Sequence, residues 1–403
     1  MLSTINTQQI ILVLAVNTLV SGGITLWLYF TRGADAALAA GFSIFLVLSP
    51  ICLALASPLT FYFAKKKLED LGAKLNNPEA LKTLSNVNVV ALPFNRVLTC
   101  NDYYVTDLVP VGMSQTSLLE MAASVERESD SILGRTICDA AEHRRANLSR
   151  SSNFKDFPGR GVEATVNRTL TRVGNVNWIE ENSIAVSANF RTKIDQFLVK
   201  GKTPLLVATG RVARGIVALK DEFSDDAKKF LARLNKLQIQ SLLLTAHPKK
   251  MEHCIRKEEF LLDHIRTNLT PEGKAREVQI FRAKGNIVAV IGNDENDLPA
   301  LKAADVSFLL KGGTMHKLQA KVTPFDFEIP KLRTFLSIRE TALLAANVLN
   351  VNYIIAVLSW VLLVPLAILS AIGLLPINFH PLAAVAGVVL FGVMILLNSL
   401  RTN

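Results

Sequence analysis

The sequence predicts an α-helical membrane domain of four spans, joined to a doubly wound α/β domain that carries an inserted α+β domain. Two observations predict this class. Half of the 403 residues are hydrophobic, and they are concentrated at the two ends of the chain, in runs of the roughly 20 residues that a membrane helix needs. Between the ends, short apolar runs bounded by turn residues alternate with helical periodicity, which is typical of buried parallel strands and their covering helices.

The first apolar region contains two runs, Ile10–Phe30 and Ala37–Ala64, separated by a short polar turn. This turn is too brief to hold a domain, so the two runs are predicted to form a helical hairpin over residues 1–64. Three lysines, Lys65–Lys67, follow at once. Because basic residues are in excess in cytoplasmic loops, this end of the hairpin is predicted to lie in the cytoplasm.

A second hairpin is predicted over residues 338–403. The chain is apolar from Ala345 to Leu375, breaks at Pro376–Pro381 and is apolar again to Leu400. Two hairpins put both termini and the central region on the cytoplasmic side. We therefore expect an integral protein of the cell (inner) membrane that contacts the lipid bilayer.

The net charge of +10 comes from Lys and Arg that lie mostly in the central region. A basic balance is also typical of nucleic-acid-binding proteins, but the sequence has no basic patch interleaved with aromatic residues and no zinc-ligand pattern. We therefore predict no nucleic-acid partner. The four cysteines are scattered, with no CxxC pair, which indicates a reducing compartment and no disulfide framework.

The central region is predicted to contain two domains. Its apolar strands and periodic helices predict an α/β domain over residues 65–99 and 215–337. Residues 100–214 interrupt this rhythm with a helical part at Ser117–His143 and then short strands and glycine-rich turns, and they are predicted to be an inserted domain. The predicted strands of the α/β domain are Val87–Leu92, Ile239–Thr245, Ile287–Gly292 and Val306–Leu310, and its predicted helices are Asp225–Leu237 and Pro271–Ala283.

Several motifs, in a fixed order along the chain, resemble those of the heavy-metal-transporting P-type ATPases. Ser49–Pro58 resembles the membrane motif C-P-C-A-L-x-L-A-T-P, and Leu98–Thr99 resembles the end of D-K-T-G-T-L-T. Pro158–Val162 resembles the P-G-x-G-V turn, and Gly292–Leu301 resembles G-D-G-x-N-D-x-P-A-L. The resemblance covers nearly the whole chain and implies a haloacid-dehalogenase-like phosphorylation domain with a nucleotide-binding-like insertion. It also implies that the chain begins at the second half of the family's membrane domain, without the actuator domain and its T-G-E loop.

The resemblance assigns the phosphoacceptor position to Pro93. Proline has no nucleophilic side chain, and Phe94–Val97 stands where the family has K-T-G-T. Because aspartyl-phosphate chemistry needs a carboxylate at this strand end, we expect no catalytic residue. Thr245, Lys274 and Asp297 match positions in the family's other phosphate-site motifs and are interpreted as inherited positions.

The resemblance assigns the magnesium site to Pro93 and Asn293, which replaces an aspartate. An amide brings no charge to an ion that prefers carboxylates and phosphate. Asp294 and Asp297 are weak candidates for a shifted magnesium site, and a solvated acidic loop is the favoured alternative. His247 replaces the carboxylate of the family's T-G-D motif, and a surface histidine in a turn is the favoured interpretation.

Nucleotide binding is predicted to be weak or absent. Ser129–Ile132 stands where the resemblance implies S-E-H-P, so the histidine that contacts adenine is lost. Gly159 and Gly161 remain, either because glycine lets the backbone approach a ligand closely or because the turn needs positive φ. We expect no bound cofactor, and ATP with Mg²⁺ at this site is the alternative.

The membrane motif has also lost its ligands. Ser49 and Ile51 replace the two cysteines that the resemblance implies, and thiolates are what hold soft metals such as Cu(I). Pro50 remains and is expected to break the helix, but we expect no metal here. The most polar feature of the third span is the cluster of Asn347, Asn350, Asn352 and Tyr353. Asn350–Asn352 is predicted to face a partner helix or a pore because polar groups in lipid need internal partners.

Two classes of function fit this sequence. The first is a membrane-anchored pseudo-ATPase that serves as a scaffold or as a regulatory or assembly subunit, with other membrane proteins as partners. It is favoured because the losses fall on chemistry, whereas the apolar strands and turns remain. The alternative is an ATP-dependent cation-transporting P-type ATPase or half of a split one. An actuator supplied by another chain would not restore the aspartate, because that strand lies in this chain. A simple phosphatase of the same fold needs the same nucleophile.

Overall fold

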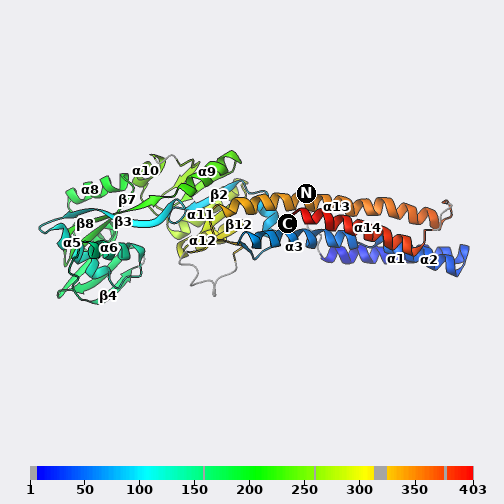
Figure 1. Cartoon of the computed structure of the whole chain (residues 1–403), viewed down its shortest axis with the longest axis horizontal. Coiled ribbons are helices and arrows are strands. Elements are labelled where there is room, and N and C mark those ends of the chain that lie inside the picture. Colours follow the sequence, from blue (N-terminus) through cyan, green and yellow to red (C-terminus); the bar gives the residue numbers. More distant parts are fainter. Residues whose placement is uncertain (1–6, 158, 258–259, 313–324, 376–378, 403) are drawn as a thin grey trace. The chain divides into compact units, whose positions relative to one another are not determined.

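A computed structural model of the chain describes residues 7–157, 159–257, 260–312, 325–375 and 379–402 (Figure 1). Pro158 of the P-G-x-G-V turn, and residues 376–378 of the break predicted at Pro376–Pro381, lie outside these described residues. The chain forms two compact units. The first contains the long apolar helices and a small group of strands, and the second contains four parallel strands and the insertion.

The first unit is dominated by long apolar helices. They are α1 (Thr7–Arg32), α2 (Ala34–Leu48), α3 (Ile51–Asp70), α13 (Thr334–Ala371) and α14 (Pro381–Ser399), followed by the short η4 (Leu400–Thr402). In the part of the chain that the structure describes, four helical segments are long and apolar enough to cross a membrane, and α2 with α3 forms one of them. The four spans predicted from the sequence are thereby confirmed.

The third span begins earlier than its apolar run. α13 starts at Thr334, well before Ala345, because its first turns bury Phe335 and Ile338 in the soluble part of the unit. The ring of Phe335 lies 4.9 Å from that of Phe308. Hydropathy alone marks the membrane part of this helix and misses the part that packs on a protein core.

A small layer of strands completes the first unit. β1 (Lys74–Leu75) pairs antiparallel with β13 (Phe327–Ile329), and β13 pairs in parallel with β12 (Val306–Leu310). α4 (Glu79–Leu84) packs against α13 and β12. The stacked rings of Phe308 and Phe327, with centroids 4.7 Å apart, lie in the buried centre of this layer. The strand predicted at Val306–Leu310 is confirmed.

The second unit is built on four parallel strands in the order β11-β2-β9-β10. Every residue of β2 and of β11 is buried, as expected for strands that are covered on both faces. The bounds of the four strands are β2 (Val89–Pro93), β9 (Gln240–Leu244), β10 (His264–Arg266) and β11 (Val288–Gly292). The three strands predicted for this region are confirmed, and β10 was not predicted.

The two predicted helices of this unit begin where capping residues place them. The hydroxyl of Ser224 accepts a hydrogen bond from Ala227 N at the start of α9 (Asp225–Lys236). The hydroxyl of Thr270 does the same for Gly273 N at the start of α11 (Pro271–Ala283). Such caps satisfy backbone donors that the helix cannot. Four short helices complete this part: η1 (Lys249–Met251), α10 (Glu252–Lys257), η2 (Glu295–Asp297) and α12 (Leu298–Ala303).

The insertion is a six-stranded antiparallel sheet in the order β3-β8-β7-β6-β5-β4. Its strands are β3 (Thr99–Pro110), β4 (Ser151–Phe157), β5 (Gly161–Val166), β6 (Thr169–Gly174), β7 (Lys202–Thr209) and β8 (Val212–Phe223). β8 continues past the boundary expected at residue 214, because it pairs with β3 as far as the Thr99–Phe223 pair. These two long strands are also the covalent connections of the insertion to the parallel strands.

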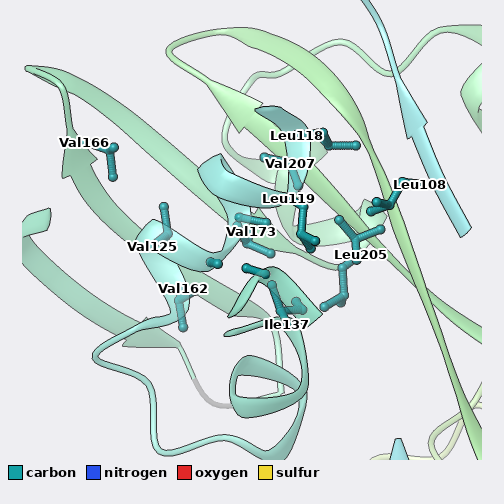
Figure 2. Close-up of a cluster of buried hydrophobic side chains, with 14 of the residues drawn as sticks. Leu108, Leu118, Leu119, Val125, Ile137, Val162, Val166, Val173, Leu205 and Val207 are labelled. Carbon is teal, nitrogen blue, oxygen red and sulfur yellow. The ribbon is translucent and has the colours of Figure 1, made fainter. Parts of the chain in front are cut away.

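Helices cover both faces of this sheet. α5 (Gln115–Glu126) and α6 (Ile132–His143) pack on one face around Leu118, Leu119 and Ile137 (Figure 2). The helical part predicted as Ser117–His143 is divided in two, because Ser131 caps α6 by accepting from Gly134 N at 2.9 Å. α7 (Val176–Glu181) and α8 (Ala188–Val199) contribute Trp178, Phe190 and Phe197 to a second core that also includes β7 and β8.

Candidate functional site

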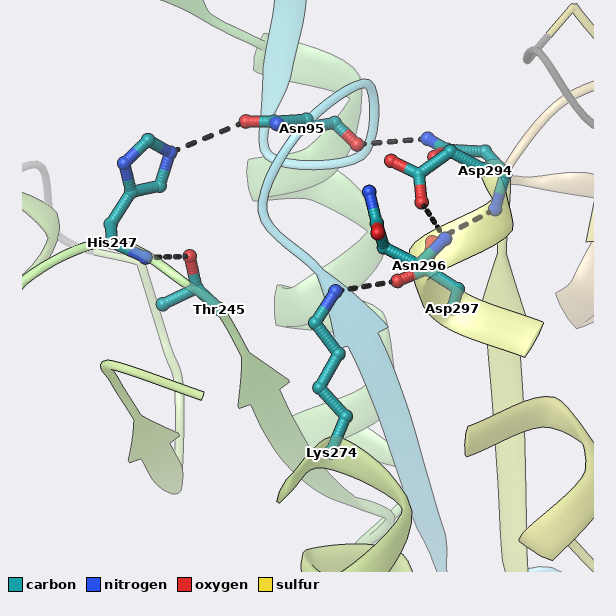
Figure 3. A network of polar contacts seen from close by, with 8 residues as sticks. Asn95, Thr245, His247, Lys274, Asp294, Asn296 and Asp297 are labelled. Carbon is teal, nitrogen blue, oxygen red and sulfur yellow. Dashed lines mark hydrogen bonds and ion pairs between the residues drawn. The ribbon is translucent and has the colours of Figure 1, made fainter. Parts of the chain in front are cut away.

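The candidate site lies where three parallel strands end. The register pairs Pro93, at the end of β2, with Leu244, at the end of β9. β11 lies on the other side of β2 and ends at Gly292. In open parallel sheets, ligands bind in the crevice outside the carboxyl ends of the strands. The loops that follow these three strands carry most of the polar residues labelled in Figure 3, and α11 carries the remaining one, Lys274.

A cavity of about 550 Å³ is lined by these loops and by residues of the insertion. It brings together the predicted residues Pro93, Gly159, Gly161, Thr245, Lys274, Asp294 and Asp297. Sequence positions from both domains therefore meet at one place, as the resemblance implies. The cavity does not include Ser49, Pro50 or Ile51, which lie between α2 and α3.

Lys274 and Asp297 form a buried ion pair. Lys274 Nζ lies 2.7 Å from Asp297 Oδ1, and the two residues are 8% and 3% exposed. The other carboxylate oxygen, Oδ2, accepts a hydrogen bond from Asn293 N at 3.2 Å. Both oxygens of Asp297 are thus engaged inside the protein (Figure 3). At Asp297 the favoured interpretation of a solvated acidic loop was wrong.

Asp294 has a local structural contact. Its carboxylate accepts from Asn296 N at 2.8 Å at the start of η2. Burial, and then the nearby negative charge of Asp297, raise the pKa of Asp294 above its usual value. Within the described ranges, no group of three or more His, Cys, Asp or Glu side chains could hold a metal ion.

Asn95 links the loops after β2, β9 and β11, and the sequence interpretation missed it. Its backbone oxygen accepts from Asn293 Nδ2 at 2.8 Å, and its side-chain oxygen lies 3.4 Å from His247 Nε2 (Figure 3). The next residue, Arg96, has a φ of 62° and donates a hydrogen bond from its guanidinium to Gly312 O. The sequence signal that could have pointed to Asn95 is the departure of Phe94–Val97 from K-T-G-T, because different side chains in this loop make different contacts.

His247 is not a free surface residue, so that favoured interpretation was wrong. Its ring packs edge-on against Phe94, with centroids 4.8 Å apart, and its backbone N–H donates to the Thr245 hydroxyl at 3.2 Å. The residue is half-buried. Burial, and then the positive charge of Lys274, lower its pKa from 6.5 to about 4.

This lowered pKa predicts a loss of stability in mild acid. As pH falls below 6.5, the unfolded state takes up the His247 proton while the folded state stays neutral down to about pH 4. Stability therefore falls with decreasing pH across this window and is unaffected by this group above it. When the pH is lowered from about 7.5 to about 5.5, we expect the free energy of unfolding of His247→Gln to fall by about 1 kcal/mol less than that of the wild type. Urea unfolding at the two pH values measures this, and equal losses in both proteins would contradict it.

The two glycines of the predicted nucleotide turn are explained by backbone geometry. Gly159 has a φ of 73°, and its carbonyl accepts from Asn175 Nδ2 at 3.1 Å. A Cβ at Gly161 would lie 2.4 Å from Val173 O and 2.6 Å from Gly174 Cα. Both positions therefore need glycine even without a ligand.

Glu126 is not among the residues that line the cavity, but it is a buried carboxyl that the sequence interpretation did not identify. It lies in the last turn of α5 and is 4% exposed, and a Cβ at Gly134 would lie 2.5 Å from its Oε2. Burial raises the pKa of the Glu126 carboxyl to about 7. No sequence motif marked it, because only the packing of α5 on α6 buries this carboxyl.

The membrane motif forms a helix break. α2 ends at Leu48 and α3 begins at Ile51, with Ser49 extended and Pro50 before the first turn. Ser49 O accepts from Trp360 Nε1 at 3.3 Å, which satisfies a carbonyl that the break frees. The break predicted at Pro50 is thereby confirmed.

Asn352 joins three membrane helices. Its amide nitrogen donates to Thr60 Oγ1 at 3.0 Å and to Ser399 Oγ at 2.8 Å, and its oxygen accepts from Asn398 Nδ2 at 2.9 Å. Asn352, Thr60 and Ser399 are fully buried, whereas Asn350 is exposed. Of the predicted polar feature, Asn352 thus faces partner helices of the same chain.

Comparison with known proteins agrees with this geometry. The family model described as haloacid dehalogenase-like hydrolase matches residues 111–305. A copper-exporting P-type ATPase of Staphylococcus epidermidis is 26% identical over 297 residues, which cover 73% of this chain and 37% of that protein. A copper-exporting P-type ATPase of Staphylococcus aureus is 27% identical over 286 residues, covering 71% and 35%. The chain thus spans little more than a third of the length of these relatives.

Solved structures share the fold. The crystal structure of a zinc-transporting PIB-type ATPase in the E2.Pi state superimposes with a TM-score of 0.66 and 24% identity, covering 97% of this chain and 62% of that chain. The catalytic domain of the CPx-ATPase CopB-B gives a TM-score of 0.52 and 19% identity over 68% of this chain. The chain is therefore an integral membrane protein related to the copper-exporting P-type ATPases, with a haloacid-dehalogenase-like α/β domain and four helical segments long and apolar enough to cross a membrane.

Proposed function

We propose that this protein is a membrane-anchored pseudo-ATPase that forms no phosphoenzyme and serves as a scaffold or regulatory subunit of a membrane complex. The observation that carries the proposal is the end of β2. Pro93 stands at the carboxyl end of this buried strand, where the family's chemistry needs a nucleophilic carboxylate. The central region and both termini are taken to be cytoplasmic, as the lysines after α3 favour.

The contacts around Pro93 support the same proposal. Asp297 is neutralised by Lys274, and Asn293 is hydrogen-bonded to the backbone of Asn95. The side chains that would otherwise hold Mg²⁺ and phosphate are thus used to fix the loops. Any nucleotide that entered the cavity would find no described carboxylate cluster to bring Mg²⁺ with it.

The membrane helices support it as well. Thiolates would be needed to hold a soft metal at the break, but Ser49 and Ile51 stand there instead of cysteines. The buried polar side chains of α3, α13 and α14 bond to one another. A cation-transporting ATPase, whole or split, is the alternative that the following test separates.

Acid-quenched phosphorylation with labelled ATP tests the proposal. In native membranes, we expect no hydroxylamine-labile label on this chain, because the Pro93 side chain has no carboxylate to form an acyl phosphate. A copper-exporting P-type ATPase in the same membranes serves as the positive control. Pro93→Asp is the matched variant, and it separates a missing nucleophile from a disabled site. Hydroxylamine-labile label on the wild-type chain would overturn the proposal.

Purification in mild detergent tests the scaffold role itself. We expect a membrane protein to co-elute in a fixed ratio with the full chain, because retained cores with lost chemistry favour a binding role. Recovery of the chain alone, as a monomer without ligand, would count against a scaffold or regulatory subunit.

A further inference from the structure

We propose that one end of the insertion's six-stranded sheet is a docking surface for an acidic protein segment. This surface, the arginine end, is defined by Arg150, Arg168 and Arg211. It deepens the proposed function by naming the chemistry of a partner, and it rests on that proposal only for the expectation that a partner exists. The surface lies at the opposite end of the sheet from Gly159 and Gly161, which line the cavity.

The strand register brings the first two arginines together. β4 begins at Ser151, which pairs with Val166, the last residue of β5. The next strand begins at Thr169, which also pairs with Val166. Arg150, directly before β4, and Arg168, in the turn between β5 and β6, therefore lie at the same end of the sheet.

The third arginine follows from the next two pairings. Thr171 of β6 pairs with Thr209 of β7, and the following residue, Gly210, donates its N–H to Leu170 O at 2.7 Å. The β7–β8 turn, which contains Arg211, is thus held beside the β5–β6 turn. The start of β4, the β5–β6 turn and the β7–β8 turn thus each place one arginine at the same end of the sheet.

These guanidinium groups are available to a partner. Arg150, Arg168 and Arg211 are exposed, and none of them takes part in the ion pairs found among the described residues of the insertion. Arg144 and Arg145, in the loop that leads to β4, are also exposed, and they too take no part in the ion pairs found among the described residues of the insertion. The end therefore carries a positive charge that the described part of this chain does not neutralise.

Of three acidic residues near this end of the sheet, two already accept hydrogen bonds from the insertion itself. Glu120 accepts from Asn147 N at 3.1 Å, and Glu128 accepts from the Ser151 hydroxyl at 2.8 Å. Glu142 lies in the last turn of α6, next to the loop that holds Arg144. The positive excess remains when these three carboxylates are included against the five arginines.

The turns hold the arginines in place before any partner arrives. Asn167 and Arg168 have φ values of 51° and 64°, which is the backbone of a tight hairpin turn. Asn167 Nδ2 donates to Ser149 Oγ at 3.2 Å, which ties this turn to the segment that contains Arg150. Fixed backbones lower the ordering entropy that a partner would otherwise have to overcome.

The geometry favours an extended acidic peptide. Adjacent strands lie about 4.8 Å apart, so turns two strands apart are separated by about 10 Å. An extended chain rises about 3.3 Å per residue and its side chains alternate between two sides, so carboxylates on one side lie about 6.6 Å apart at two residues and about 13 Å apart at four, which brackets this spacing. Guanidinium groups bind carboxylates with two parallel hydrogen bonds, which lysine cannot do.

Two other anionic partners fit the surface less well. Residues 144–151, 166–169 and 209–212 contain no aromatic residue, so bases of a single-stranded nucleic acid would find no stacking platform. In the two hairpin turns, the exposed large apolar residue is Val212, whereas binding to a bilayer surface usually adds buried apolar area to charge attraction. Carboxylates therefore remain the favoured ligands.

Fluorescence anisotropy with a labelled oligoglutamate peptide tests the inference on the full chain in detergent micelles. The test variant is R150Q/R168Q/R211Q, and the control is K229Q/K236Q/R276Q, which removes the same charge from exposed positions on α9 and α11. We expect at least about tenfold weaker binding for the arginine variant and at most about twofold for the control. Binding by the wild type should weaken as salt is raised.

Three outcomes would overturn the inference. One is no oligoglutamate binding by the wild type, and another is an equal loss in both variants, which would mean a response to net charge alone. The third is a loss of binding to phosphatidylserine vesicles or oligouridylate, but not to oligoglutamate, in the arginine variant. A chain that forms an acyl phosphate and still binds oligoglutamate through these arginines would refute the proposed function and leave this inference standing.

Discussion

Replacing Lys274 by Met is expected to destabilise the second unit by about 3–5 kcal/mol. The substitution keeps most of the side-chain volume but removes the charge that lies 2.7 Å from Asp297 Oδ1. Asp297 is 3% exposed, so its carboxylate would remain buried without a counter-charge. Removing one partner of such a pair costs much more than the pair itself contributes, because the remaining ion has lost its water.

Trp178 provides the measurement. It is buried in the second unit, and the chain has two other tryptophans, Trp27 and Trp360, in the membrane helices. In a W27F/W360F background, urea unfolding followed by Trp178 fluorescence reports on the second unit. The comparison is between this background with and without Lys274→Met.

Two further variants separate charge from packing. K274M/D297L removes both charges and should recover most of the loss, because no buried ion is left. Arg256→Ala breaks an ion pair with Glu252 whose arginine is 56% exposed, and it should cost at most about 0.5 kcal/mol. A loss below about 1 kcal/mol for Lys274→Met would contradict the buried ion pair.

Replacing Asn352 by Leu is expected to destabilise the membrane bundle by about 2 kcal/mol. The variant loses three side-chain hydrogen bonds, to Thr60, Ser399 and Asn398, each of which contributes about 0.6 kcal/mol on average in membrane proteins. It also leaves the buried hydroxyl of Ser399 without its donor. Thermal unfolding of the full chain in detergent, followed by the helical signal in circular dichroism, measures the effect.

Asn350→Leu is the matched control on the same helix. Asn350 is exposed on α13, so the same chemical change there removes no described hydrogen bond between helices. We expect a change within about 0.5 kcal/mol. Equal effects of the two variants would mean that the network around Asn352 does not hold the helices together.

The sequence predicted the elements of this fold well, for local reasons. The helix Pro271–Ala283 was predicted with its observed bounds, because a helical periodicity runs through it. β11 is an uninterrupted apolar run, and such a run between turns predicts a buried strand without any tertiary information. In contrast, β10 is a three-residue strand with mixed polarity and gives no such signal.

Helix ends that depend on packing were not predicted. α13 extends back to Thr334 because Phe335 packs on Phe308, a residue that is adjacent only in the fold. The helical part of the insertion was predicted as one segment, although Ser131 caps a second helix there. Hydropathy and periodicity average over such local breaks.

The sequence by itself determined which side chains stand at the motif positions Pro93, Asn293 and Ser49. Only the tertiary structure decided which contacts the residues around these positions make. Asn95 accepts from Asn293 across the loops of two strands, and Lys274 is buried against Asp297 instead of solvated. Such contacts join residues far apart in the chain, and their burial is a property of the folded surroundings that no local pattern encodes.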